Sequence, residues 1–250
     1  MKVFKYINLC LLMELQRNND FKQLLINLPT VLFHHIKSYT LFIPKTKEEL
    51  EEAINIWCKN RIFIEVSYCH IGLWDTINIT DMSNLFFAKH YLNDNINYWD
   101  VSNVKNMKGM FSHCKIFNQP LNNWDVSNVE NMKDMFSNAY KFNQDLDNWN
   151  VKNVIDMQQM FYLAIKFDKN INSWNVKNVL DMSGMFSYTK DFNKPLNKWN
   201  VENVKDISGM FYQAKSFNQN LDRWKINYGT KKTSVFGLNR YMKYTPYWYH

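Results

Sequence analysis

Apolar residues recur along most of this chain with a fixed period of 25 residues. Counted from a tryptophan at position zero, Met or Ile stands at plus eight, Phe at plus twelve and Leu or Phe at plus eighteen. A fixed period in the twenties indicates stacked units, each of which buries its apolar side against its neighbours. The tryptophans that define the period are Trp74, Trp99, Trp124, Trp149, Trp174, Trp199 and Trp224.

Within one unit the pattern predicts a short strand followed by a short helix. Residues 121–129 alternate apolar and polar positions around Trp124 and Val126, which is typical of a strand. Apolar residues at 132, 135 and 136 have the spacing of one helix face, and Asn131 is a favoured residue to cap its start. We therefore predict an α/β repeat solenoid of seven units, in which the strands form a parallel sheet.

Two polar columns follow the same period. Asparagine stands at plus four from Asn78 to Asn203, and Asn or Asp stands at plus nineteen from Asn93 to Asn218. Backbone groups at the turns of a stacked coil need partners, and a side-chain amide can both donate and accept. We expect both columns to bond neighbouring units.

The run Trp-Asp-Val-Ser-Asn-Val-Glu-Asn-Met-Lys-Asp-Met-Phe at 124–136 resembles the repeat of the BspA-like leucine-rich-repeat surface proteins. That 25-residue repeat is also found in mycoplasma-type lipoproteins and in repeat proteins of large DNA viruses. The resemblance covers about residues 46–227. It implies a leucine-rich-repeat-like, right-handed coil of short parallel strands and short helices that binds proteins and has no enzymatic activity.

The sequence divides into four parts: a helical N-terminal segment (1–45), an N-terminal cap (46–70), the solenoid (71–227) and a basic, aromatic C-terminal cap or tail (228–250). Thr46 and Glu49 form a capping box that predicts a helix through about Cys58, and residues 62–66 are predicted as a strand. Trp224 is expected to begin an incomplete unit that lacks the Asn, Met and Phe columns. We interpret the aromatic tail as a cover for the last coil.

Residues 28–39 resemble the opening of an F-box, a motif that docks on a Skp-type adaptor of a ubiquitin ligase. The matching positions are Leu28, Pro29, Leu32 and Ile36, whereas Val31 stands where that family usually has an acidic residue. The alternative interpretation, which we prefer, is a helical pair that packs on the end of the solenoid.

Composition and charge reduce the number of function classes that this protein could belong to. The 46% hydrophobic content excludes wholesale disorder, and the chain has no apolar run of about 18 residues, so no transmembrane segment is predicted. The net charge of +7 is concentrated in residues 225–250, while residues 71–224 are neutral, which does not favour a nucleic-acid interface.

Without an export signal or a regular cysteine framework, we predict an intracellular protein with reduced thiols; a cell-surface or virion location is the alternative.

No catalytic constellation, cofactor motif or regularly spaced set of metal ligands is found, although His90, His113 and Cys114 fall near one another in the repeat. We therefore predict a monomeric, non-enzymatic protein that binds another protein, and no small molecule, through the strand face. The alternatives are a surface adhesin or virion-associated structural protein, and an F-box-like substrate receptor. The predicted partner-binding residues are Tyr98, Asp100, Ser102, Asp125, Ser127, Asn150, Lys152, Asn175, Lys177 and Lys198.

Overall fold

The computed structural model describes residues 42–237, 242 and 245–249. The chain divides into two compact units, residues 1–41 and 42–250, and all that follows concerns the second. The F-box-like residues Leu28, Pro29, Leu32 and Ile36 lie outside the described residues, as does most of the predicted helical segment 1–45.

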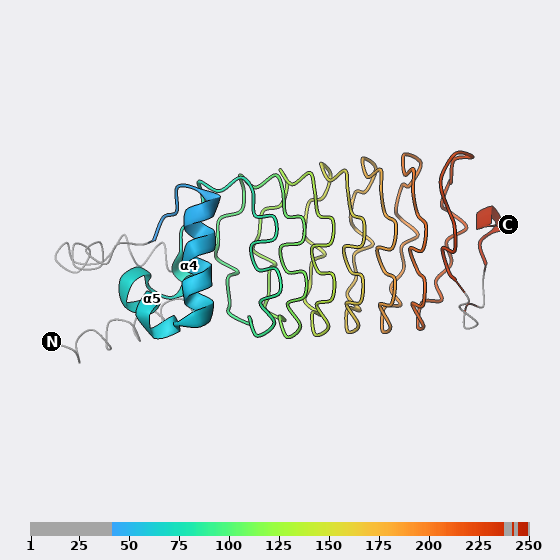
Figure 1. Ribbon diagram of the computed structural model, residues 1–250. Coiled ribbons are helices and arrows are strands. Elements are labelled where there is room, and N and C mark those ends of the chain that lie inside the picture. Colours follow the sequence, from blue (N-terminus) through green and yellow to red (C-terminus); the bar gives the residue numbers. More distant parts are fainter. Residues whose placement is uncertain (1–41, 238–241, 243–244, 250) are drawn as a thin grey trace. The chain divides into compact units, whose positions relative to one another are not determined.

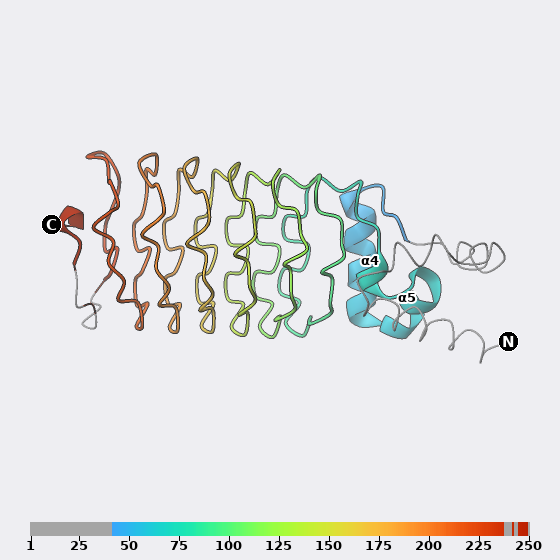
Figure 2. The same ribbon diagram turned by 180° about the vertical axis from the view of Figure 1, so that it is seen from behind.

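Residues 74–237 wind as successive 25-residue coils that lie side by side (Figures 1 and 2). Backbone N–H groups reach from one coil to the next: that of Met132 donates to Asp156 O at 2.9 Å and that of Phe136 to Met160 O at 2.8 Å. A single-residue parallel bridge also joins each pair of coils at plus seven. These bridges are Asp81–Asn106, Asn106–Asn131, Asn131–Asp156, Asp156–Asp181, Asp181–Asp206 and Asp206–Lys231.

The prediction of an α/β, leucine-rich-repeat-like solenoid is wrong, because the coils contain neither the expected strands nor the expected helices. Between residues 74 and 237 the only pairing of strand type is the isolated bridge, and no sheet forms. The predicted strand around Trp124 is interrupted by reverse turns: Trp124 N–H bonds Leu121 O at 3.2 Å, and Val129 N–H bonds Val126 O at 3.0 Å. The apolar alternation there marks side chains that point inward from turns.

The predicted helix at plus eight to plus twelve is also a series of turns. Asp134 and Asn138 have φ angles of 57° and 59°, a left-handed conformation that ends any α-helix. Met135 N–H bonds Met132 O at 3.2 Å, which closes a four-residue β-turn. Such turns bring residues 132, 135 and 136 to the same inward side, so their spacing imitates that of a helix face.

The core is a set of columns parallel to the stack. The side chains of the Trp, Met and Phe columns are at most 4% exposed. The rings of Trp149 and Trp174 stack with centroids 6.4 Å apart, and those of Phe136 and Phe161 with centroids 5.6 Å apart. Trp124 Nε1 donates to Ile96 O of the preceding coil at 3.1 Å. Every buried side-chain nitrogen or oxygen in the described part of the chain has a hydrogen-bond partner.

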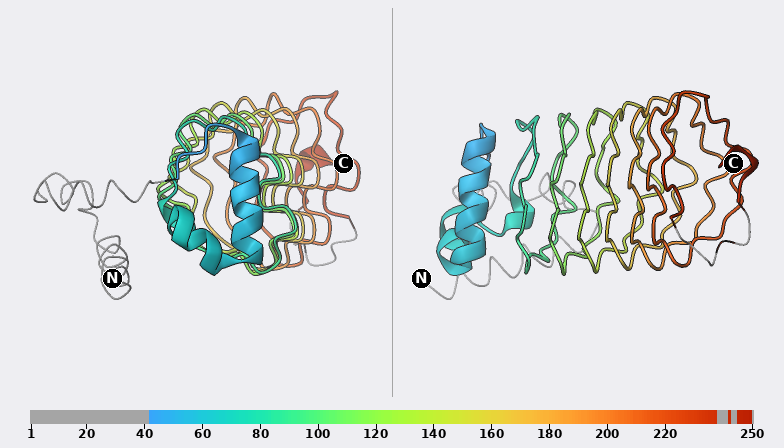
Figure 3. Two further views of the ribbon diagram at one scale, coloured as in Figure 1. Left: turned by 60° about the vertical axis from the view of Figure 1, so that its left-hand side comes forward. Right: turned by 45° about the vertical axis from the view of Figure 1, so that its right-hand side comes forward.

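Helix α4 (Lys47–Lys59) lies across the first coil (Figure 3). The capping box is confirmed, because Thr46 Oγ1 accepts the N–H of Glu49 at 3.3 Å. The helix packs through one apolar face, of which Trp57 is 1% exposed. Trp57 Nε1 and the Arg61 guanidinium both donate to Asp94 Oδ2, at 3.1 and 2.9 Å, and this fixes the helix to the coil.

The predicted strand at 62–66 is wrong, because these residues belong to helix α5 (Arg61–Tyr68). Ile64 N–H bonds Asn60 O at 3.4 Å, and the Ile64 side chain is fully buried. The strand preference of β-branched residues depends strongly on context, and here Ile64 is buried from a helix. A short 3-10 helix, η1 (Ile71–Leu73), then leads into the first coil.

The last coil is more complete than the sequence suggested. Phe236 stands at plus twelve from Trp224 and stacks on Phe211 with centroids 5.7 Å apart, so the expected absence of the Phe column is wrong. Trp248, in the 3-10 helix η2 (Tyr247–Tyr249), stacks on Trp224 at 6.1 Å. Its Nε1 donates to Leu221 O at 3.1 Å, as the other column tryptophans do to theirs. Residues 245–249 thus lie against the last coil.

Replacement of Trp124 by alanine should lower the free energy of unfolding by about 3–5 kcal/mol, because it leaves a large cavity and removes the bond to Ile96 O. Chemical denaturation of the full chain measures this. Asn123→Ala, on the exposed side of the same turn, should change stability by less than about 0.5 kcal/mol. Equal effects of the two substitutions would contradict the buried-column account.

Candidate functional site

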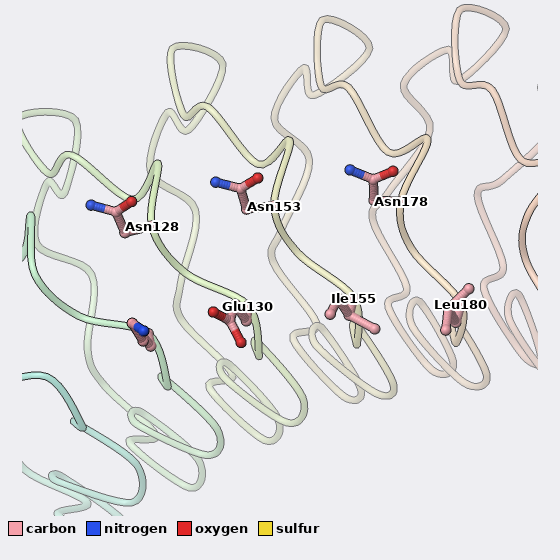
Figure 4. A pocket seen from close by; sticks show the side chains of 7 residues that line it. Asn128, Glu130, Asn153, Ile155, Asn178 and Leu180 are labelled. Carbon is pink, nitrogen blue, oxygen red and sulfur yellow. The ribbon is translucent and has the colours of Figure 1, made fainter.

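An open groove of about 560 Å³ runs along one side of the stack and crosses four coils. Figure 4 shows two rows of side chains along it, one from plus four and one from plus six. The first row is Asn128, Asn153 and Asn178, and the second is Lys105, Glu130, Ile155 and Leu180.

The rows point outward because the residue between them points inward. Val129, Val154 and Val179 at plus five are fully buried, so the side chains on either side of each valine face solvent. The plus-six backbone is held from coil to coil: Ile155 N–H donates to Glu130 O, and Leu180 N–H donates to Ile155 O, both at 2.8 Å. The floor of the groove is therefore a fixed backbone ladder.

The asparagine row confirms the predicted bonding between units. Asn128 Nδ2 donates to Ser102 O at 2.8 Å, and Asn153 Nδ2 donates to Ser127 O at 2.7 Å, in each case on the preceding coil. In Figure 4 the Oδ1 atoms of this row point the opposite way, toward the following coil. The second polar column is also confirmed, because Asn143 Oδ1 accepts the N–H of Asp168 at 3.0 Å.

The predicted partner-binding residues form three rows, at minus one, plus one and plus three. Those at plus one close turns: Asp100 and Asp125 accept the N–H of the residue two positions on, each at 3.0 Å. Asn150 and Asn175 do the same at 3.4 and 3.3 Å. Tyr98 and Lys198, at minus one, are exposed.

Only the predicted row at plus three borders the groove. The carbonyl oxygens of Ser102, Ser127, Lys152 and Lys177 accept the asparagine amides of the next coil. The side chains of Lys152 and Lys177 are exposed at this rim.

Sequence reasoning missed the plus-six row, because that position lies between the end of the predicted strand and the predicted helix cap. A signal was nevertheless present. The column reads Thr80, Lys105, Glu130, Ile155, Leu180 and Lys205. Two apolar residues in a column that is otherwise polar have no structural reason, since the same backbone accepts Thr, Lys and Glu.

The histidine and cysteine pair singled out from the sequence serves the fold. His90 Nδ1 bonds His113 O at 2.8 Å, and the buried Cys114 thiol donates to Phe86 O at 3.0 Å. Burial raises the pKa of Cys114 far above its usual range. Among the described residues, no three His, Cys, Asp or Glu side chains gather so that they could hold a metal ion.

A second furrow, of about 310 Å³, follows the turns at plus nine to plus fourteen. Burial raises the pKa of the Asp134 carboxyl in it above the ordinary value, although Lys133 and Lys108 oppose the shift. Ionisation of a carboxyl with a raised pKa destabilises the fold. This unfavourable contribution is absent below the ordinary pKa of the carboxyl and grows as pH rises from that value through the raised pKa. This furrow carries no set of groups suited to catalysis or binding.

The comparisons with known proteins identify a family. The family model described as "Mycoplasma protein of unknown function, DUF285" matches residues 59–169 and 144–246, which together span more than half of the chain. The chain therefore belongs to this family, and the predicted resemblance to a mycoplasma-type repeat is confirmed. The matched ranges do not include the F-box-like residues. No curated protein and no solved structure gives a significant match.

Asn153→Ala should lower the free energy of unfolding by about 1 kcal/mol, because it removes the hydrogen bond to Ser127 O. Asn153→Asp should lower the free energy of unfolding further at pH 7. The ionised carboxylate cannot donate a hydrogen bond, so it faces the carbonyl oxygen of Ser127 as a second acceptor. As pH falls through the ordinary pKa of aspartate, the carboxyl becomes a donor and this excess should shrink. Denaturation of both variants at pH 7 and pH 4 measures the difference, and Lys152→Ala is the control. A pH-independent difference would contradict the donor role.

Proposed function

We propose that this protein is a non-enzymatic binding protein that holds a partner protein in the groove of its coiled stack. The observation that carries the proposal is the apolar pair at the groove floor. Ile155 is 44% exposed and Leu180 is partly exposed, in a column whose other members are Thr, Lys and Glu. Exposed apolar side chains that the fold does not need are typical of the centre of a binding surface.

The surroundings of this pair support the same interpretation. The groove floor is held by backbone bonds, so its side chains are presented without a large entropy cost on binding. Charged residues border the apolar centre, with Glu130 on one side and Lys205 on the other. Such an arrangement of an apolar centre and a charged periphery selects and orients a partner.

Two further expectations belong to the proposal. We propose that the protein acts as a monomer, because α4 covers one end of the stack and Trp248 packs on the other. We also propose an intracellular location, which is supported by unpaired thiols at Cys58, Cys69 and Cys114. No helix in the described ranges is long and apolar enough to cross a membrane.

The experiment is affinity capture with quantitative mass spectrometry, in which the tagged full chain is compared with Ile155→Thr/Leu180→Thr. Thr80 occupies the same column, so the double variant should keep its melting temperature. Partners of the groove should be enriched by the wild-type chain and lost with the double variant. Tyr228→Thr, at a fully exposed position outside the groove, is the control and should keep them. If the double variant and the wild-type chain capture the same proteins, the groove is not the binding surface.

The predicted plus-one row is tested separately with Asp100→Asn/Asp125→Asn. Asparagine keeps the turn, as Asn150 and Asn175 do, while it removes two negative charges. We expect weaker partner binding at an unchanged melting temperature. Unchanged binding would restrict the site to the groove.

A further inference from the structure

We infer that the occupant of this groove is an amphipathic α-helix of the partner protein. The inference rests on the proposed function and specifies the chemistry of the partner. Its helix would place two apolar side chains, three or four residues apart, on Ile155 and Leu180.

The spacing of the coils favours a helix over an extended segment. Coils joined in parallel register lie about 4.8 Å apart, which sets the distance between neighbouring rungs of the groove. One helical turn rises about 5.4 Å, so residues on one helix face follow the rungs to within about 0.6 Å per coil. Residues on one face of a strand recur every 6.6 Å or so and depart from the rungs by about 2 Å per coil. Over the four coils of the groove, an extended segment loses register and a helix keeps it.

The hydrogen bonds of the groove lead to the same conclusion. A strand adds to a surface through unpaired backbone groups. Here the backbone is already paired: Leu180 N–H bonds Ile155 O at 2.8 Å, and Lys205 N–H bonds Leu180 O at 2.8 Å. The carbonyls of the neighbouring plus-three row are occupied by the asparagine amides. A helix satisfies its own backbone, so it requires only side-chain contacts from the groove.

The charges define the rest of the helix. Along the floor, Glu130 precedes the apolar pair and Lys205 follows it. The complementary helix face has a basic residue one turn before its two apolar residues and an acidic residue one turn after them, in the direction of the stack. Across the groove, exposed Lys152 and Lys177 precede the asparagine row, whereas Asp156 and Asp181 follow the apolar row. The lysine side favours acidic residues on the flank of the helix that faces it, and the aspartate side favours basic residues on the opposite flank.

The test uses three fluorescein-labelled synthetic peptides of about 15 residues, long enough to form helix on a surface. The first is an alanine- and glutamine-rich helix with Lys, Leu, Leu and Glu at successive turns. In the second, the two leucines are replaced by alanine, which removes the apolar contacts with Ile155 and Leu180 in either direction of binding. In the third, two central alanines of the first peptide are replaced by proline, which prevents helix formation. Fluorescence anisotropy with the full chain measures each dissociation constant, and circular dichroism measures the helix gained on binding.

We expect the first peptide to bind at least about tenfold more tightly than the other two, and to gain helix when bound. Ile155→Thr/Leu180→Thr should weaken its binding by about tenfold or more, whereas Tyr228→Thr should leave it unchanged. Equal binding of the proline peptide, no binding by any peptide, or binding that the double variant does not weaken would each overturn the helix proposal. If these results occur while partner capture still depends on Ile155 and Leu180, the proposed function stands and only the identity of the occupant is wrong.

Discussion

From Trp99 to Trp224, the indole N–H of each column tryptophan donates to a backbone carbonyl 28 residues earlier, and the rest of the stack depends on this bond. Trp149, Trp174 and Trp199 do so at distances of 3.0, 2.8 and 3.0 Å. The bond satisfies a buried carbonyl and a buried indole together, and it fixes the distance between coils at which the rings stack. It also explains the constant period, because one inserted residue would move a tryptophan away from its acceptor and from the ring before it.

Because the interior is fixed in this way, the outer positions are free to vary. The plus-five valines are invariably inside, but their neighbours at plus six include Thr, Lys, Glu, Ile and Leu on the same backbone. The widest chemical variation, from charged to apolar residues, therefore falls on outward-facing rows. The apolar pair Ile155 and Leu180 stands out for this reason. A few side chains at plus six therefore determine the polarity of the groove, while the backbone beneath them repeats from coil to coil.

The repeat unit and its buried columns could be predicted from the sequence, because a 25-residue period has one simple physical explanation. The bonding of Asn128 and Asn153 could be predicted too, since side-chain amides at turns must serve the backbone. The local conformation could not. Residues 132, 135 and 136 suit a helix by spacing alone, and only the left-handed φ angles of Asp134 and Asn138 show that they lie on turns. Propensity gives little warning of this, because the backbone N–H groups of Asp134 and Asn138 bond residues 24 positions away, on the next coil.

The direction of the ladder between coils has a consequence for assembly. From plus eight to plus fourteen, N–H groups of one coil point to carbonyls of the next, as Gly209 N–H does to Thr233 O at 2.9 Å. The stack therefore has chemically different ends, and two copies could continue it only head to tail, which leads to an open fibre. Helix α4 lies against the first coil, at one of these ends. The backbone groups of a helix bond within the helix, so the repeating ladder has a boundary there and is not continued beyond the first coil.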